Sequence, residues 1–248
     1  MKKYHCLFIV LALAGGMIGL SYTRAKALKV LVFSRTVGGY RHASIAAGKT
    51  MFLQLGKKYG ALVDTTEDPS VFTVARLRAY DVIVFLSTRG DILDSSQQQA
   101  FTAFIHRGGG FVGIHAATTT EYEWPWYNKL IGAYFDGHPE PQRALYTVTD
   151  KDFPVTRSLP DTFSRVDEIY NFRSVQDSLH YLVTVNEKTY TGGKMGDFHP
   201  VSWYHSFEGG RVFYIGLGHF DAAYSDPLFV NATWNGVLWA ADRKTLHP

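Results

Sequence analysis

The chemistry that this sequence can offer rests mainly on its histidines. Ten are present, and five of them fall where a loop or a strand end is expected: His42, His115, His138, His199 and His219. An imidazole titrates near neutral pH and also binds transition metals, so a group of histidines can provide acid–base catalysis or a metal site. No two of the five have the close spacing of a zinc-binding helix, and a single histidine is more often structural.

Carboxylates within reach of the histidines would complete either kind of site. Asp167-Glu168 stands at an apolar stretch typical of a strand, and Asp197 lies in a glycine-rich loop. Both positions are candidates for the acidic partner of a histidine or for a metal ligand.

Several other reaction types are excluded or disfavoured. Cys6 is the only cysteine, and it lies in an apolar segment at the start of the chain, so residues 28–248 have no thiol nucleophile, disulfide or thiolate metal ligand. Ser34, Ser87 and Ser202 lack the setting of a serine nucleophile. The glycines of residues 108–113 precede a strand, whereas a dinucleotide fingerprint follows one and opens a helix.

Residues 1–27 have the features of an export signal. Lys2 and Lys3 precede an apolar run over residues 6–20, and the small-residue sequence Ala-Lys-Ala at 25–27 resembles a cleavage site. The apolar run is shorter than a membrane-spanning helix requires, although an uncleaved anchor is the alternative. We therefore expect an exported bacterial protein that resides in the periplasm.

Removal of this segment changes the charge balance. It carries four of the 25 basic residues and none of the 22 acidic ones, which leaves 21 basic and 22 acidic side chains in residues 28–248. This balance gives no reason to expect binding to nucleic acid or to an acidic membrane surface. We expect one domain over residues 28–248, with no stable membrane insertion after cleavage.

The elements that must position the histidines alternate between strands and helices in the first half. Strands are expected at 29–34, 61–66 and 81–87, and helices at 43–59, 74–80 and 95–107. A further short strand is expected within 108–117, after the three glycines that close the last of these helices. The strand at 81–87 is continuously apolar, as in a parallel sheet buried on both faces. Strand, helix and strand at this spacing predict a doubly wound α/β fold. Ligands bind at the carboxyl ends of such strands. His115, the middle residue of a sharp elbow at 113–117, should therefore face a cleft.

The second half predicts shorter strands. They are expected at 144–149, 165–172, 181–186, 201–207 and 211–217, with an interrupted helix at 122–135 and a last helix at 228–241. The final two strands should form a hairpin through the loop 208–210. This loop would place Trp203 opposite Ile215 and His199 opposite His219, whereas a two-residue loop would shift the pairing by one.

Possible contacts to a substrate come from a cation and from aromatic rings. Arg41 follows Gly38-Gly39 after the first strand and can bind an anion there, or belong to an ordinary strand–helix loop. Trp124, Trp126 and Tyr127 can form a flat surface for a sugar, or simply pack in the core.

Several of these motifs together resemble the ThuA-like family, named for trehalose utilisation. The matching segments, in order, are 39–45, 113–117, 124–127, 132–135 with His138-Pro139, Asp167-Glu168, 193–197 with His199-Pro200, and 209–214 through Gly218-His219. They span nearly all of residues 28–248.

The resemblance implies a flavodoxin-like fold, similar to class I glutamine amidotransferases, with a mostly parallel sheet, helices on both faces and an antiparallel C-terminal hairpin. In those enzymes the elbow carries a catalytic cysteine, where this chain has His115. The glutaminase reaction is therefore not inherited with the fold. Family members are linked with the metabolism of disaccharides and oxidised (keto) sugars.

We therefore expect a carbohydrate-metabolising hydrolase or isomerase that acts on a disaccharide or keto-sugar derivative. The expected catalytic residues are His115, Glu168, His42 and His219. The expected substrate contacts are Arg41, Trp124, Trp126, Tyr127 and Asp197. If a divalent metal is present, its expected ligands are His115, His138 and His199. The alternatives are a sugar-binding protein without turnover and a metal-dependent hydrolase.

Overall fold

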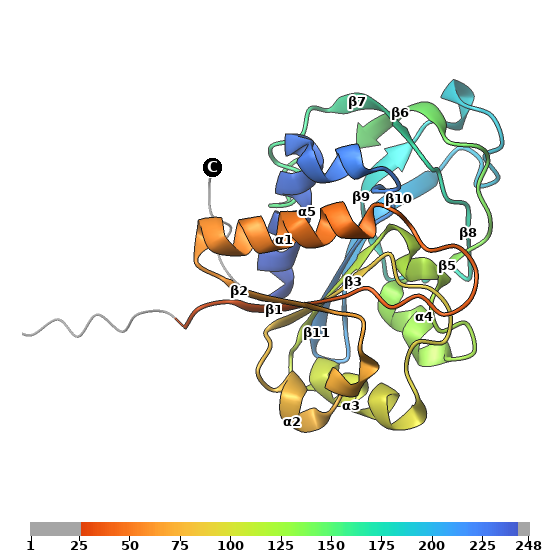
Figure 1. The fold of residues 1–248 in the computed structure, drawn as a ribbon. Helices are drawn as coiled ribbons and strands as arrows, with labels where there is room; N and C mark the ends of the chain where they lie inside the picture. The colour runs from red at the N-terminus through yellow and green to blue at the C-terminus, as the bar shows by residue number, and fades with distance from the viewer. Residues whose placement is uncertain (1–25, 243–248) are drawn as a thin grey trace, which may run out of the picture.

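A nine-stranded mixed sheet runs through the middle of the molecule (Figure 1). The computed structural model describes residues 26–242, so nearly all of the predicted signal peptide lies outside the described residues. The strand order is β2-β1-β3-β4-β11-β10-β9-β6-β7. The strands are β1 (Lys29–Phe33), β2 (Leu62–Thr66), β3 (Val82–Leu86), β4 (Gly110–Ile114), β6 (Gln142–Val148), β7 (Thr162–Asp167), β9 (His180–Val185), β10 (His199–Phe207) and β11 (Gly210–Ile215).

Parallel pairing joins the first five strands in this order, and antiparallel pairing joins the rest. The predicted fold class is confirmed, and the antiparallel part extends beyond the predicted hairpin to β9, β6 and β7. A separate small sheet pairs β5 (Tyr134–Phe135) with β8 (Phe172–Arg173). None of the helices within residues 26–242 is long and apolar enough to cross a membrane.

Helices cover both faces of the sheet. Figure 1 shows α1 and α5 on one side and α2, α3 and α4 on the other. The helices are α1 (Ile45–Tyr59), α2 (Val74–Leu77), α3 (Ser95–His106), α4 (Pro125–Ile131) and α5 (Pro227–Ala240). Short 3₁₀ turns occur at η1 (Pro69–Val71), η2 (His115–Thr119), η3 (Glu187–Thr189) and η4 (Asp221–Ser225).

Two hydrophobic clusters, one on each face, explain the continuously apolar strands. Val30 and Val32 of β1 belong to the cluster under α1 and α5, and Leu31 and Phe33 belong to the cluster under α2, α3 and α4. Because side chains alternate along a strand, each apolar residue meets a helix layer whichever way it points.

The predicted register of the final hairpin is wrong by one residue. Ser202 pairs with Ile215, and Phe207 pairs with Gly210, so the loop is the two residues Glu208 and Gly209. Both have positive φ, 45° and 96°, which is typical of the tight turn that suits a two-residue hairpin. This shift also removes the predicted pairing of His199 with His219.

Two other segments differ from their predicted form. The helix expected over 122–135 begins only at Pro125, because proline is well suited to a first helical position. The strand expected over 165–172 is broken between Asp167 and Phe172. In the gap, Asn171 instead exchanges backbone hydrogen bonds with the loop at Asp136 and Gly137. The broken strand frees Glu168 to face the carboxyl ends of the parallel strands.

The contact between α5 and β11 leaves no room for a side chain at Gly236. A Cβ there would lie 2.1 Å from Cδ1 of Phe213, a fully buried ring. We expect Gly236→Ala to lower the free energy of unfolding by about 1–3 kcal/mol through overpacking, despite the better helix propensity of alanine. Urea denaturation would measure the loss. The control is Thr50→Ala on the exposed side of α1, which should change the free energy of unfolding much less than Gly236→Ala does. A glycine control such as Gly60→Ala is unsuitable, because Gly60 has φ 69° and the substitution would strain the backbone.

Candidate active site

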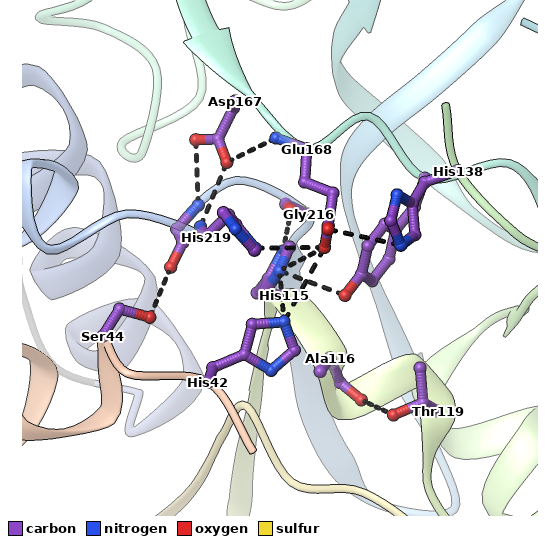
Figure 2. A network of polar contacts seen from close by, with 12 residues as sticks. His42, Ser44, His115, Ala116, Thr119, His138, Asp167, Glu168, Gly216 and His219 are labelled. Atoms are coloured by element: carbon purple, nitrogen blue, oxygen red, sulfur yellow. Dashed lines mark hydrogen bonds and ion pairs between the residues drawn. The ribbon is translucent and has the colours of Figure 1, made fainter. Parts of the chain in front are cut away.

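Four chain segments bring polar side chains together at the carboxyl edge of the parallel strands. His42 follows β1, His115 follows β4, and His219 comes soon after β11. Glu168 comes directly after β7, and Figure 2 shows its carboxylate among the imidazole rings. This is the edge at which ligands bind in open α/β sheets.

His115 lies at a strained turn between β4 and the 3₁₀ turn η2. Its φ is 50°, a left-handed conformation that is uncommon for residues other than glycine, and its side chain is fully buried. Strained backbone of this kind is often found at functional sites. The elbow expected from the sequence is therefore present, and it directs His115 into the centre of the cluster (Figure 2).

One oxygen of Glu168 contacts three histidines. Its Oε2 lies 3.2 Å from His115 Nε2, 3.1 Å from His219 Nδ1 and 3.7 Å from His42 Nε2. The Nε2 atoms of His42 and His115 are 3.0 Å apart. The four ligand atoms all lie within 4.8 Å of one another. We call these four residues the His₃Glu cluster.

The tautomer of His115 follows from its outer hydrogen bond. Its Nδ1 lies 2.8 Å from the backbone carbonyl of Gly216, which can only accept, so Nδ1 carries the hydrogen. In the neutral ring, Nε2 then presents a lone pair to the cluster. The Tyr170 hydroxyl, 3.0 Å from this atom, donates to that lone pair.

Asp167 holds the backbone of two cluster residues in place. Its Oδ1 accepts the N–H groups of Glu168 and His219, both at 3.0 Å. Its Oδ2 accepts from Gly218 N and from Arg165 Nε, each at 3.1 Å. Asp167 is fully buried, and all four donors converge on its carboxylate. The adjacent acids in the sequence thus have different roles: Glu168 faces the cluster and Asp167 supports it.

Burial and the contacts with Glu168 shift the pKa values of three cluster residues. Burial lowers the pKa of His42 to about 4, against the raising effect of Glu168. For Glu168, burial acts to raise the pKa, but the contacts with three histidines hold it well below its usual range. The contact with Glu168 raises the pKa of His219. Near neutral pH the His₃Glu cluster therefore has an ionised carboxylate and a neutral His42, the forms that bind metals.

The donor geometry also fits a divalent metal. Three imidazole nitrogens and one carboxylate oxygen form a donor set used for zinc and related ions. His219 Nδ1 is buried and has no hydrogen-bond partner within residues 26–242, although it lies 3.1 Å from Glu168. The His115 Nδ1 contact with Gly216 is the outer hydrogen bond typical of a metal-bound histidine.

The predicted metal ligands His138 and His199 lie apart from the ligand atoms of the His₃Glu cluster. His138 Nε2 is 3.2 Å from the other oxygen of Glu168, Oε1, and its side chain is 34% exposed. His199 is fully buried, and both its ring nitrogens are engaged: Nε2 with the Tyr170 carbonyl and Nδ1 with Glu187 and a tyrosine hydroxyl, each at 2.8 Å.

The predicted substrate contacts are also dispersed. Arg41 is bound to Glu67 at 2.8 Å and to the Ser34 carbonyl, so its charge is already paired. Asp197 lines a surface hollow beside Glu187 and Lys188.

The predicted aromatic platform packs against α3 and the hairpin turn. Trp124 and Trp126 stack on each other with ring centroids 4.8 Å apart, and Trp126 Nε1 donates to Glu208. Tyr127 is fully buried, and its hydroxyl donates to the Ala117 carbonyl.

Sequence reasoning missed Tyr170 and Gly216 at the site. Tyr170 stacks on His115 with ring centroids 4.5 Å apart and is 5% exposed. Its position two residues after Glu168 would place it on the same face of a continuous strand, which is the one signal that the sequence offered. Gly216 contributes only a backbone carbonyl, which no residue pattern could reveal.

Comparisons with known proteins agree on the family and the fold. The family model for ThuA, described as trehalose utilisation, matches residues 29–240. A solved structure described as a ThuA-like protein from Bacteroides uniformis ATCC 8492 is 28% identical, with a TM-score of 0.71, over 91% of this chain and 94% of that one. A second structure described as a ThuA-like protein, from Parabacteroides merdae ATCC 43184, is 21% identical, with a TM-score of 0.76. That match covers 90% of this chain and 93% of the other.

A more distant likeness extends to the amidotransferase-like fold. A Thermoplasma acidophilum protein described as a GMP synthase component is 12% identical, with a TM-score of 0.55, over 88% of this chain and 96% of that one. At this identity the likeness concerns the fold alone. No curated protein shows significant similarity to the chain.

Proposed function

The chain belongs to the ThuA family, described as trehalose utilisation, and on that premise we propose that it is a carbohydrate-converting enzyme with a metal centre in the His₃Glu cluster. The observation that carries the proposal is the approach of His42 Nε2, His115 Nε2, His219 Nδ1 and Glu168 Oε2 to within 4.8 Å of one another. His42, His115, His219 and Glu168 would hold the metal. When bound, a divalent ion polarises a carbonyl oxygen or activates water for hydrolysis.

The residues of the chain supply the remaining functions. His138 contacts the outer oxygen of Glu168 and is partly exposed, so it is positioned to exchange protons between the cluster and a bound sugar. The Tyr170 hydroxyl reaches His115 Nε2, an atom whose lone pair a metal would occupy. With that acceptor taken, the hydroxyl is free to donate to an oxygen of the substrate.

Exposed aromatic rings beside the cluster support a carbohydrate substrate. Tyr40 is 56% exposed and Phe220 is 39% exposed. Their rings contact those of His42 and His219, with centroids 4.9 and 4.6 Å apart. An aromatic ring exposed next to polar groups is suited to the apolar face of a sugar. We propose that these rings, and not Trp124 and Trp126, contact the sugar.

The proposed reaction is hydrolysis or isomerisation of a disaccharide or keto-sugar derivative. Hydrolysis needs a proton delivered to the leaving oxygen and one removed from water, and isomerisation needs a proton moved at the carbon next to a carbonyl. The cluster and its neighbours can provide such proton transfers. The signal-like residues 1–27 support a periplasmic site of action in a bacterium, although residues 1–25 lie outside the described residues. Localisation of the full-length protein after cell fractionation would test this assignment.

A substrate screen with metal control would test the proposed function. The protein, purified without chelator, is expected to contain close to one equivalent of a divalent transition metal by elemental analysis. Turnover of trehalose, related disaccharides and their 3-keto derivatives should fall at least about 100-fold after chelation and return on metal addition. Turnover that survives complete metal removal would reject the metal centre and leave acid–base catalysis. Sugar binding without any turnover would reject the enzyme.

A further inference from the structure

Arg89 is a cation beside the site that has no acidic partner. Within residues 26–242 its guanidinium makes no ion pair and no hydrogen bond. Arg41 is paired with Glu67, Arg165 with two aspartates, and Arg173 with Asp136. Arg35, whose carbonyl accepts the Arg89 N–H, also makes no ion pair within these residues. Arg89 is also only partly exposed. A half-buried guanidinium loses part of its hydration, and without an anion no ion pair compensates for that loss. Such a group is suited to bind an anionic ligand.

The backbone around Arg89 is held firmly. Val37 N donates to the Arg89 carbonyl at 2.8 Å, and Arg89 N donates to the Arg35 carbonyl at 3.2 Å. The next residue, Gly90, forms a bridge with Thr120. These bonds join the loops after β1 and β3 to the segment that follows His115. Arg89 is therefore fixed relative to the strand ends that carry His42 and His115.

Gly39 allows the side chain of Arg89 to lie against the loop after β1. A Cβ at this position would lie 2.4 Å from Arg89 Nε and 2.8 Å from Cζ, closer than any side chain could tolerate. Gly39 also has φ 64°, which a residue with a side chain rarely adopts. Glycine is thus required at position 39, three residues before His42, for the guanidinium of Arg89 to lie where it does.

The guanidinium of Arg89 lies beside the loop that leads to His42. The residue after Gly39 is Tyr40, whose ring contacts that of His42 with centroids 4.9 Å apart. Arg89 therefore lies against the loop that carries both a cluster histidine and an exposed aromatic ring.

We propose that Arg89 forms an oxyanion-binding subsite next to the His₃Glu cluster, so that the sugar acted on carries a carboxylate or a phosphate. This inference rests on the proposed function for the identity of the ligand as a sugar. The planar guanidinium binds either group through two parallel N–H bonds, and it would direct the opposite end of the sugar ring to the cluster.

Calorimetric titration with three sugars would test the subsite. We would use D-glucuronate, glucose 6-phosphate and neutral D-glucose, each with the metal-loaded and the chelated protein. At least one anionic sugar should bind about 10- to 100-fold more tightly than glucose, and Arg89→Met should remove that advantage while glucose binding stays unchanged. The stronger anion identifies carboxylate or phosphate as the preferred group.

Two further variants separate charge from geometry. Arg89→Lys keeps the charge but not the planar fork, and Gly39→Ala keeps Arg89 but displaces its guanidinium, so both should lose most of the preference. Arg76→Gln removes an exposed positive charge from α2 and should leave the preference intact.

Three outcomes would overturn the subsite. They are equal affinity for all three sugars, an anion preference that survives Arg89→Met, and an anion preference that disappears on chelation while Arg89→Met has no effect. The last of these would show that the anion binds to the metal. An anion preference that persists without metal and without turnover would support the subsite even if the proposed enzyme function fails.

Discussion

Replacing His115 by asparagine is expected to remove metal binding and turnover together. Nε2 of His115 contacts two other ligand atoms of the His₃Glu cluster, His42 Nε2 at 3.0 Å and Glu168 Oε2 at 3.2 Å. Loss of a ligand at this position should lower metal occupancy to a small fraction of one equivalent. Turnover should fall by at least about 10²–10⁴, the range typical of a lost metal ligand or acid–base group.

Asparagine is the appropriate replacement because of the backbone at this position. His115 has φ 50°, and asparagine tolerates the left-handed conformation better than alanine does. Elemental analysis and initial rates would be measured on protein whose near-ultraviolet circular dichroism matches the wild type. His205→Gln is the matched control, since His205 is equally buried but bonds to the Leu130 carbonyl far from the cluster. Full metal content and full activity in His115→Asn would contradict the proposed centre.

The cluster was largely predictable because parallel strands end at one edge of a sheet. His42, His115 and His219 each follow a parallel strand, and a single topological inference therefore brings them together. The position of Glu168 could not be predicted from this topology alone, because it depends on a break in a strand that was predicted to be continuous. That break arises from backbone bonds between Asn171 and a distant loop, which leave no pattern in the sequence.

The incorrect or dispersed predictions have specific physical causes. The pairing of His199 with His219 failed because a two-residue turn, Glu208-Gly209, replaced the expected three-residue loop, and a shift of one residue reverses which face a side chain occupies. Arg41 pairs with Glu67, which directly follows β2, so the charge of Arg41 is neutralised by an acid that only the assembled sheet brings close.

The same limitation hid Arg89. In the sequence it is an ordinary loop residue, and its importance comes from a missing partner and from the space left by Gly39. Both are properties of the assembled loops, so neither could be read from residue types and spacing.

Asp167→Asn is expected to weaken both the fold and the metal centre, because one side chain supports both. Each carboxylate oxygen of Asp167 accepts two N–H donors, and an asparagine has only one oxygen. Whichever way the amide is oriented, its NH₂ group would face two further donors in a fully buried site. Arg165 would also lose the ion pair at 3.1 Å. Breaking a buried pair of this kind costs about 3–5 kcal/mol, which urea denaturation of the chelated protein would measure.

The effect on the metal should be separable from the effect on stability. Glu168 N and His219 N both donate to Asp167 Oδ1, so the variant loosens two of the four ligands, and metal affinity should fall about 10- to 100-fold. Asp226→Asn provides the comparison, because Asp226 also pairs with Arg165, at 2.8 Å, but touches no cluster residue. It should lower stability to a smaller extent and leave metal affinity unchanged. If the two variants changed metal affinity equally, the effect would come from Arg165 or from general loosening, and Asp167 would not be the residue that positions Glu168 and His219.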